Sequence, residues 1–277
     1  MRLRPGVLIR HSVLMITVVI TLAPILFTAL TAFKLRRDII SVTFFDFEPT
    51  WNNFRALFEG SRGLFDQLTM NSLIAGVGST ILVVTIAAFA AYGLSRFTWG
   101  RLASGLLLGW LLFVYMLPPI TFAGPYYVSA RAIGIYDTPW VLVFAHAVLT
   151  LPFAVWLLQS FFAEVPKELE EAAFIDGATR AQSFFLIALP MVRSGLVATA
   201  ILTFIFSWKD FLFALVLTST AAGNTIPVGI ASFVQEFDLK YGEMSAAAIL
   251  AVIPGVIMIL FAQRHIVKGM TMGALKG

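Results

Sequence analysis

The sequence lacks cysteine and carries little charge, and both absences narrow its class. Without cysteine it can form neither disulfides nor thiolate metal sites. Only 12% of its 277 residues are charged and 59% are hydrophobic, whereas a soluble domain carries about 25% charged residues. A water-soluble fold could not bury so much apolar surface, so lipid must be part of its solvent.

The sequence also gives little support for a histidine metal site or for nucleic-acid binding. The three histidines, His11, His146 and His265, lie far apart and show no metal-ligand spacing. The net charge of +4 comes from basic residues scattered between apolar runs rather than from a single stripe. This pattern argues against a nucleic-acid partner.

Apolar runs bounded by charged residues predict an all-α polytopic membrane protein. A helix needs about 20 apolar residues to cross a bilayer core of roughly 30 Å. Six transmembrane helices are expected in a single domain over residues 1–277, namely residues 12–33, 71–94, 102–127, 139–162, 194–217 and 244–263. The first run is too long for a signal-peptide core and no A-x-A site follows it, so we interpret it as a retained span.

The distribution of Lys and Arg favours cytoplasmic N- and C-termini. More of these residues fall in the inner segments than in the outer ones when the N-terminus is placed inside. The first outer loop is the exception, because it contains five basic residues. It also contains five acidic residues, which count little in this rule.

Residues 165–190 form the longest inner loop and read as helix, turn, helix. Pro166 suits the first helical position, where no N–H is needed. Asp176-Gly177 would end the first helix, with glycine in the left-handed conformation. Thr179 followed by Gln182 is typical of a capping box that opens a second short helix.

The first helix of this loop combines acidic residues with a small apolar strip. Glu168, Glu170 and Glu171 place negative charge near its positive end, beside Leu169, Ala172 and Ala173. Helices that rest on a membrane surface usually carry Lys and Arg instead. We therefore favour docking into another protein, with a surface-bound amphipathic helix as the alternative.

These residues resemble the cytoplasmic EAA loop of binding-protein-dependent ABC permeases. The match comprises Glu171-Ala172-Ala173, Gly177 after three intervening residues, and Ile187-Ala188-Leu189-Pro190 after nine more. Residues 71–72, 91–97 and 151–162 agree with it. The tail, residues 263–277, resembles the end of carbohydrate permeases of the maltose-permease type.

The resemblance implies a bacterial cytoplasmic (inner) membrane location and three kinds of protein partner. These are a second permease subunit, an ATPase subunit dimer and an extracytoplasmic solute-binding protein, the last facing residues 221–243. The EAA helix would dock into the ATPase. The implied ATPase-coupling residues are Glu171, Ala172, Ala173, Asp176, Gly177, Leu189 and Pro190.

The chain has no G-x-x-x-x-G-K-[ST] segment and therefore no P-loop of its own. We expect it to be a transport subunit rather than an enzyme and to bind no cofactor. ATP and Mg²⁺ would act on partner ATPase subunits.

Lys209 and Asp210 stand out because they lie inside the fifth span. Central charges cost roughly 2.5–3.5 kcal/mol on insertion scales and usually face a cavity or a partner. Adjacent residues diverge by about 100° on a helix, so the two should not pair with each other. With Trp208 they are expected to line either the translocation path or the subunit interface. His146, within the fourth span, is expected to be a hydrogen-bonded packing residue.

The predicted function is a permease subunit of an ATP-driven importer, forming half of the path for a sugar or related polyhydroxyl solute. One alternative is a polyol or glycerol phosphate as the solute. Another is an ion-coupled secondary transporter, but no internal repeat is clear and Asp210 is the one acid well inside a predicted span. A membrane enzyme is disfavoured, because paired carboxylates, metal clusters and nucleophile–base spacings are lacking.

Overall fold

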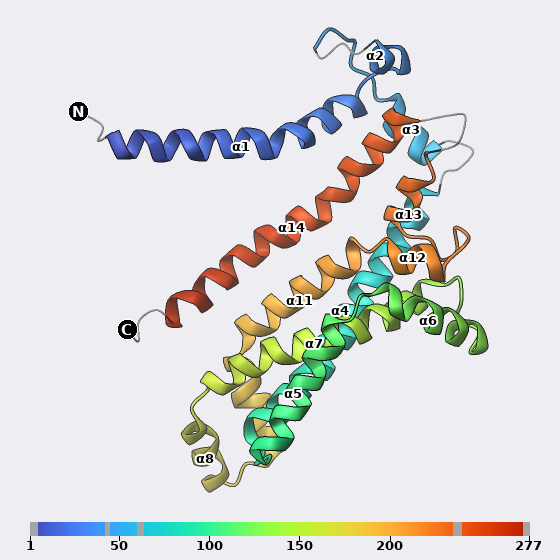
Figure 1. The fold of residues 1–277 in the computed structure, drawn as a ribbon. Helices are drawn as coiled ribbons and strands as arrows, with labels where there is room; N and C mark the ends of the chain where they lie inside the picture. Colours follow the sequence, from blue (N-terminus) through green and yellow to red (C-terminus); the bar gives the residue numbers. More distant parts are fainter. Residues whose placement is uncertain (1–4, 42–44, 60–63, 235–239, 274–277) are drawn as a thin grey trace. The chain divides into compact units, whose positions relative to one another are not determined.

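The computed structural model describes residues 5–41, 45–59, 64–234 and 240–273, with side chains placed from residue 10 to 261 except at Arg101. Over these residues the chain is helical and contains no β-strand, so the predicted all-α class is confirmed (Figure 1). Four helices are long and apolar enough to cross a membrane, and two sharply bent helix pairs raise the number to six. The chain packs as two units, residues 1–66 with 229–253 and residues 67–228 with 254–277.

The first unit is organised by one amide side chain. It contains α1 (Pro5–Ala32), α2 (Arg36–Ile40), α3 (Asn52–Glu59) and the start of α14 (Tyr241–Gly273). The Asn53 amide donates to the carbonyls of Ala32 and Lys34 at 2.8 and 2.9 Å and so satisfies the end of α1. A Cβ atom at Gly242 would lie 2.6 Å from this amide. Position 242 must therefore be glycine for α14 to approach α3 this closely.

Three long helices form the centre of the second unit: α4 (Phe65–Arg96), α7 (Pro139–Glu164) and α11 (Arg193–Trp208). Small residues let them pack closely, as they do in membrane bundles. Cβ atoms at Gly76 and Gly78 would lie 2.9 Å from the Phe204 ring and 2.8 Å from Val143. Helix α7 is the most buried span, with 67% of its apolar window inside the protein.

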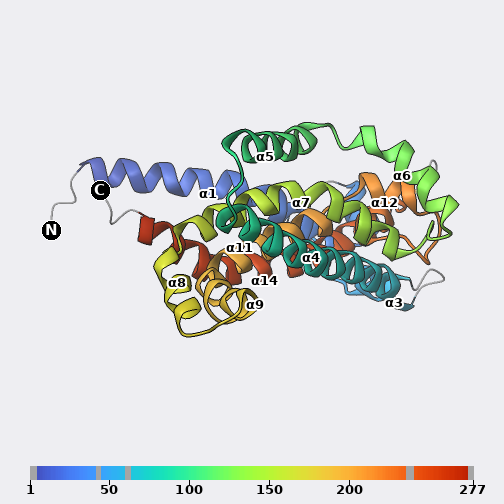
Figure 2. The ribbon, with the colours of Figure 1, turned by 90° about the horizontal axis from the view of Figure 1, so that it is seen from below.

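The third predicted span, residues 102–127, is not one continuous helix. It divides into α5 (Arg101–Met116) and α6 (Ile120–Ala132), which meet at 91° (Figure 2). The residue before a proline avoids the helical region, and Leu117 is extended (φ −66°, ψ 136°) ahead of Pro118-Pro119. The apolar run is continuous in sequence, but the proline pair divides it.

The fifth predicted span, residues 194–217, is also interrupted. Helix α11 ends at Trp208, and α12 (Leu212–Leu217) follows after three non-helical residues, so Lys209 and Asp210 lie in a break rather than on a helix. The Asp210 carboxylate accepts hydrogen bonds from the N–H groups of Phe213 and Ala214, in the first turn of α12. An aspartate that caps the next helix in this way competes with continuation of the previous one.

A helical hairpin joins α7 to α11. It consists of α8 (Lys167–Ile175), α9 (Arg180–Ser183), the π-helix η1 (Phe184–Ala188) and α10 (Leu189–Met191). We call residues 165–191 the hairpin. Figure 2 shows α8 and α9 side by side at one end of the second unit.

The loop after α12 is fixed to the start of α4. The Asn71 amide donates to the carbonyls of Ala221 and Asn224 at 3.0 and 2.9 Å, and the Ser72 hydroxyl accepts from the N–H of Ile226 at 2.9 Å. The short helix α13 (Ile226–Ala231) follows. Of the expected outer stretch 221–243, residues 235–239 lie outside the described residues, as do residues 274–277 of the tail.

Asp137 ties the same loop to the start of α7. Its backbone has a positive φ of 61°, which aspartate tolerates better than most residues. Its carboxylate accepts from the N–H groups of Ser219 and Thr220 and from the Thr220 hydroxyl, at 2.8, 2.9 and 2.6 Å. Burial opposes ionisation of Asp137, but these hydrogen bonds outweigh it and lower the pKa of the carboxyl group.

We expect Asp137→Asn to lower the thermal stability of the protein at neutral pH by about 1 kcal/mol, because the site is partly exposed. Asparagine keeps the backbone conformation, so the loss of stability reports removal of the negative charge. A lowered folded-state pKa stabilises the protein above the ordinary pKa of 3.8 and ceases to do so as pH falls through the folded value. Unfolding curves of the detergent-solubilised protein should therefore differ at neutral pH and converge in acid; coincident curves at neutral pH would contradict the assignment.

Candidate functional site

The turn of the hairpin is built as the sequence predicts. Gly177 has φ +87°, its N–H donates to the Phe174 carbonyl, and the N–H of Ala178 donates to the Ala173 carbonyl. These two hydrogen bonds form a Schellman motif, which closes α8 after its C-cap Asp176. No atom lies within 4 Å of a Cβ built at Gly177, so the backbone conformation, and not crowding, requires glycine.

The two helix starts of the hairpin are also defined locally. Thr179 and Gln182 form the predicted capping box: the Thr179 hydroxyl accepts from the Gln182 N–H at 3.2 Å, and the Gln182 side chain accepts from the Thr179 N–H at 2.8 Å. Pro166 is the N-cap of α8 and Lys167 is the first helical residue. The expected place of the proline was therefore wrong by one position.

Glu170 anchors the hairpin to the end of α4. Its side chain is buried, and it accepts hydrogen bonds from the Tyr92 hydroxyl at 2.6 Å and from the Ser183 hydroxyl at 2.9 Å. The Arg96 guanidinium forms an ion pair with the same carboxylate and donates to the Val165 carbonyl at 2.9 Å. We call Glu170, Tyr92, Arg96 and Ser183 the glutamate lock.

The lock holds a charge that burial alone would suppress. Burial opposes ionisation of Glu170, but the hydrogen bonds from Tyr92, Arg96 and Ser183 outweigh that effect and lower its pKa. Glu170 therefore remains a carboxylate at neutral pH. Three donors from two parts of the chain converge on it, as a buried charge requires.

The π-helix η1 packs the other arm of the hairpin against α4. The buried Phe184 ring stacks on Phe89 at 4.9 Å between centroids and meets the Tyr92 ring edge-on at 4.9 Å. The Arg180 guanidinium lies 5.1 Å from the centre of the Phe97 ring, just beyond the end of α4. The hairpin therefore has polar, aromatic and cationic contacts with one helix.

The rest of the hairpin surface combines charged and polar side chains with exposed apolar ones. The exposed large hydrophobic side chains are Leu169, Phe174, Ile175, Phe185, Leu186 and Met191, and two of them, Ile175 and Leu186, are 87% and 72% exposed. Glu171 and Ala172 are exposed beside them. We call this set the apolar face of the hairpin. Apolar side chains that project from a capped, rigid hairpin are typical of a docking surface.

The break between α11 and α12 forms the second notable site. The buried His146 imidazole on α7 contacts the Ser207 hydroxyl through Nδ1, and its Nε2 lies 3.1 Å from the Asp210 carboxylate. Lys209 is exposed. Trp208 is buried and stacks on Phe204 with ring centroids 5.5 Å apart. Asp210 thus pairs with a histidine and the amides of α12, leaving the lysine charge directed outward.

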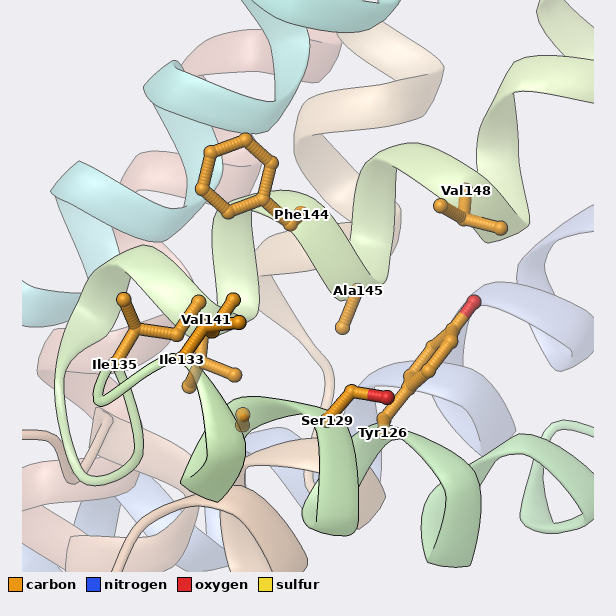
Figure 3. Close-up of a pocket in the computed structure, with 9 residues that line it drawn as sticks. Tyr126, Ser129, Ile133, Ile135, Val141, Phe144, Ala145 and Val148 are labelled. Carbon is orange, nitrogen blue, oxygen red and sulfur yellow. The ribbon is translucent and has the colours of Figure 1, made fainter.

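A pocket of about 140 Å³ lies between α6 and α7. Figure 3 shows its lining, in which Tyr126 and Ser129 supply the hydroxyl groups and the other side chains are apolar. A sugar needs many hydrogen-bond partners, so this pocket is unsuited to one. Within the described residues, no three His, Cys, Asp or Glu side chains gather to hold a metal ion.

Comparison with known proteins decides the family. Residues 83–272 match the model of the binding-protein-dependent transport system inner membrane component. The chain belongs to this family. The match covers the hairpin and the break, so both are parts of a transport permease.

The relatives of this permease include sugar transport components. It is 40% identical to the trehalose transport system permease protein SugB of Mycobacterium tuberculosis, over 82% of each chain. It is 34% identical to the trehalose/maltose transport system permease protein MalG of Thermococcus litoralis, over 94% of this chain and 93% of that one. A bacterial ABC transporter that imports the acidic polysaccharide alginate has a chain of the same fold, with a TM-score of 0.79 at 17% identity over 93% and 95% of the two chains.

The structure distributes the expected coupling residues of the permease over two environments. Glu171, Ala172, Asp176, Gly177 and Pro190 are exposed, and Ala173 and Leu189 are half-buried. Leu189 packs against the core that contains Phe184 and Ala188. The exposed residues can meet a partner, whereas Leu189 fixes the hairpin to the rest of the permease.

The sequence analysis missed the glutamate lock and the partner of Asp210. Glu170 was grouped with its acidic neighbours, although it is the buried one. A signal was present in sequence: Tyr92 and Arg96 stand four residues apart, on one face of a helix that ends where the hairpin must attach. The expectation that His146 packs through hydrogen bonding agrees with its contact to Ser207.

Proposed function

We propose that this permease forms half of the translocation path for a sugar or related polyhydroxyl solute and is driven by a separate ATPase that binds the hairpin. The observation that carries the coupling role is the apolar face of the hairpin. The Schellman motif that ends α8 and the capping box that begins α9 fix the turn between the two helices that present this face. The chain lacks a P-loop, so ATP and Mg²⁺ would be bound by the ATPase subunits.

The proposed assembly contains a second permease subunit, an ATPase dimer and an extracytoplasmic solute-binding protein. One solved complex of the same fold is titled as an alginate ABC transporter with a pentasaccharide-bound periplasmic protein, with a TM-score of 0.67. In the proposed orientation the hairpin and both termini are cytoplasmic. The loop held by Asn71 and Asp137 then faces the binding protein.

The names of several relatives support a sugar as the solute. They include trehalose, trehalose/maltose and diacetylchitobiose permeases, at 34–40% identity. A polyol or glycerol phosphate is the second candidate, and the cation of Lys209 in the proposed path favours the anionic glycerol phosphate. Calorimetric titration of the binding protein with trehalose, maltose and glycerol 3-phosphate separates the two.

Within the proposed path, Lys209 is the residue placed to face solute. Non-helical backbone at membrane depth is tolerated where protein covers it or where it lines a water-filled cavity. His146 and Ser207 cover Asp210, and the exposure of Lys209 supports the proposal that this residue lines a water-filled path. Trp208 supports the break through its stacking on Phe204.

The coupling role predicts that Gly177→Val detaches the ATPase or uncouples ATP hydrolysis from uptake. A β-branched residue at φ +87° carries strain of roughly 2–3 kcal/mol, enough to reduce hairpin docking about tenfold or more. Gly177→Asn is the matched control, since asparagine tolerates this conformation. The measurements are co-purification of the ATPase and hydrolysis by the reconstituted complex. A valine variant that behaves like wild type would remove Gly177 from the mechanism, and a wild-type permease that binds no ATPase would remove the proposed function.

The orientation predicts which side of the membrane each loop faces. The chain has no cysteine, so single cysteines can be introduced at Gln182 in the hairpin and at Asn224 in the loop after α12. In oriented vesicles, a membrane-impermeant maleimide should label position 182 from the cytoplasmic side alone and position 224 from the opposite side alone. The reversed pattern would overturn the orientation.

The path role of Lys209 predicts that Lys209→Cys reacts with water-soluble thiol reagents in the assembled complex. An anionic sulfonate reagent and a cationic ammonium reagent should react at similar rates at this position, because the lysine charge has been removed. A cysteine at buried Ala198 on α11 is the unreactive control. If position 209 stays unlabelled both without nucleotide and with trapped ATP, Lys209 belongs to the permease–permease interface instead.

A further inference from the structure

The glutamate lock connects the hairpin to a helix that reaches the opposite end of the second unit. Tyr92 and Arg96 lie at the last turns of α4, while Asn71 and Ser72 near its start hold the loop after α12. At 1.5 Å per residue, the 25 helical rises from Asn71 to Arg96 span about 37 Å. One continuous helix thus touches both the hairpin and the most distant loop of this unit.

We propose that Glu170 makes α4 move with the hairpin, so that α4 carries displacement of the hairpin to the loop held by Asn71 and Ser72. The inference rests on the proposed function, in which a partner ATPase moves the hairpin. It assigns to Glu170 a positioning role that is distinct from docking, because the side chain is 3% exposed and cannot be reached by a partner.

Charge and burial make the lock resistant to separation. Pulling the hairpin away from α4 would leave the Glu170 carboxylate and the Arg96 guanidinium buried without partners, at side-chain exposures of 4% and 8%. Breaking one side of a buried pair is far more costly than keeping both. A movement of the hairpin is therefore easier if α4 follows it than if the lock opens.

The lock restrains the orientation of α8 as well as its distance from α4. Tyr92 and Ser183 donate to one carboxylate oxygen while Arg96 Nε contacts the other, so both oxygens are engaged. The Phe184–Phe89 stack and the contact of Arg180 with Phe97 add further contacts between the second arm of the hairpin and the end of α4. Rotation of α8 about its own axis would separate Glu170 from at least one of its three donors.

Stiff packing then carries movement along α4. Gly76 and Gly78 bring α4 within contact of Phe204 on α11 and Val143 on α7, with no room for a Cβ atom. The helix cannot shorten or slide freely against such neighbours. Displacement at Arg96 is passed on as movement of the whole helix, which would pivot at Gly76 and Gly78.

The test measures whether the hairpin and α4 keep a fixed separation while the ATPase works. Nitroxide labels at Lys167→Cys on α8 and Thr98→Cys beyond α4 are introduced into the full complex, whose other subunits carry no reactive cysteine. Both positions are exposed. Pulsed electron paramagnetic resonance compares the nucleotide-free complex with the complex trapped by MgATP and vanadate.

We expect the wild-type separation to change by less than about 2 Å on trapping, which is the range of small helix shifts. In Glu170→Gln and in Arg96→Gln the ATPase should stay bound and trap nucleotide, but the separation should shift further or broaden. Glu168→Gln, an exposed acid on the same helix, is the control and should match wild type.

Three results would overturn the proposal. They are a large change of separation in wild type, an unchanged separation in both lock variants, or loss of the ATPase from both variants, which would mean that the lock only folds the hairpin. Failure of the wild-type permease to bind an ATPase would overturn the proposed function itself, and with it this inference. The two failures are therefore distinguishable.

Discussion

A carboxylate without access to water determines how this permease is held together at one end. Glu170 can remain ionised only if donors surround it, and the donors come from α4 and from the second arm of the hairpin. Folding must therefore bring residues 92–96, 170 and 183 to one point. The hairpin, which is short and has an exposed apolar face, owes its fixed position to that requirement.

The break between α11 and α12 uses the same principle. Asp210 gains the N–H groups of α12 and the nearby His146, so its charge is satisfied within the chain. Lys209 does not share in this arrangement and faces outward. Two adjacent residues of opposite charge thus have different surroundings.

Short-range patterns in the sequence were sufficient to predict the structure of the hairpin. They were insufficient to predict how the hairpin attaches to α4. The glycine turn and the Thr179–Gln182 capping box depend on residues within a few positions of each other, and both were predicted correctly. The pairing of Glu170 with Arg96 crosses 74 residues, and that of Asp210 with His146 crosses 64. No periodicity links residues so far apart; only the packing of α4, α7 and α11 brings them together.

The bent third span shows a second limit of prediction from the sequence. The proline pair at 118–119 was visible, but prolines also occur inside intact helices here, at Pro24 and Pro152. A single proline can be accommodated where neighbouring helices satisfy the freed carbonyl group. Two in succession fix two φ angles and remove two donors, which turned the chain by 91°. The sequence showed where the chain could bend, whereas the angle depends on tertiary packing.

The π-helix η1 gives a geometric meaning to the nine-residue interval between Gly177 and Ile187. A π turn contains more residues than an α turn, so η1 sets which side chains of the second arm point inward. Phe184 and Ala188 reach the core, while Phe185 and Leu186 remain outside. Adding or deleting one residue between Gly177 and Ile187 would rotate this arm by about 100° and exchange its buried and exposed sides. The number of residues in this interval therefore sets the angle at which the second arm meets the rest of the protein.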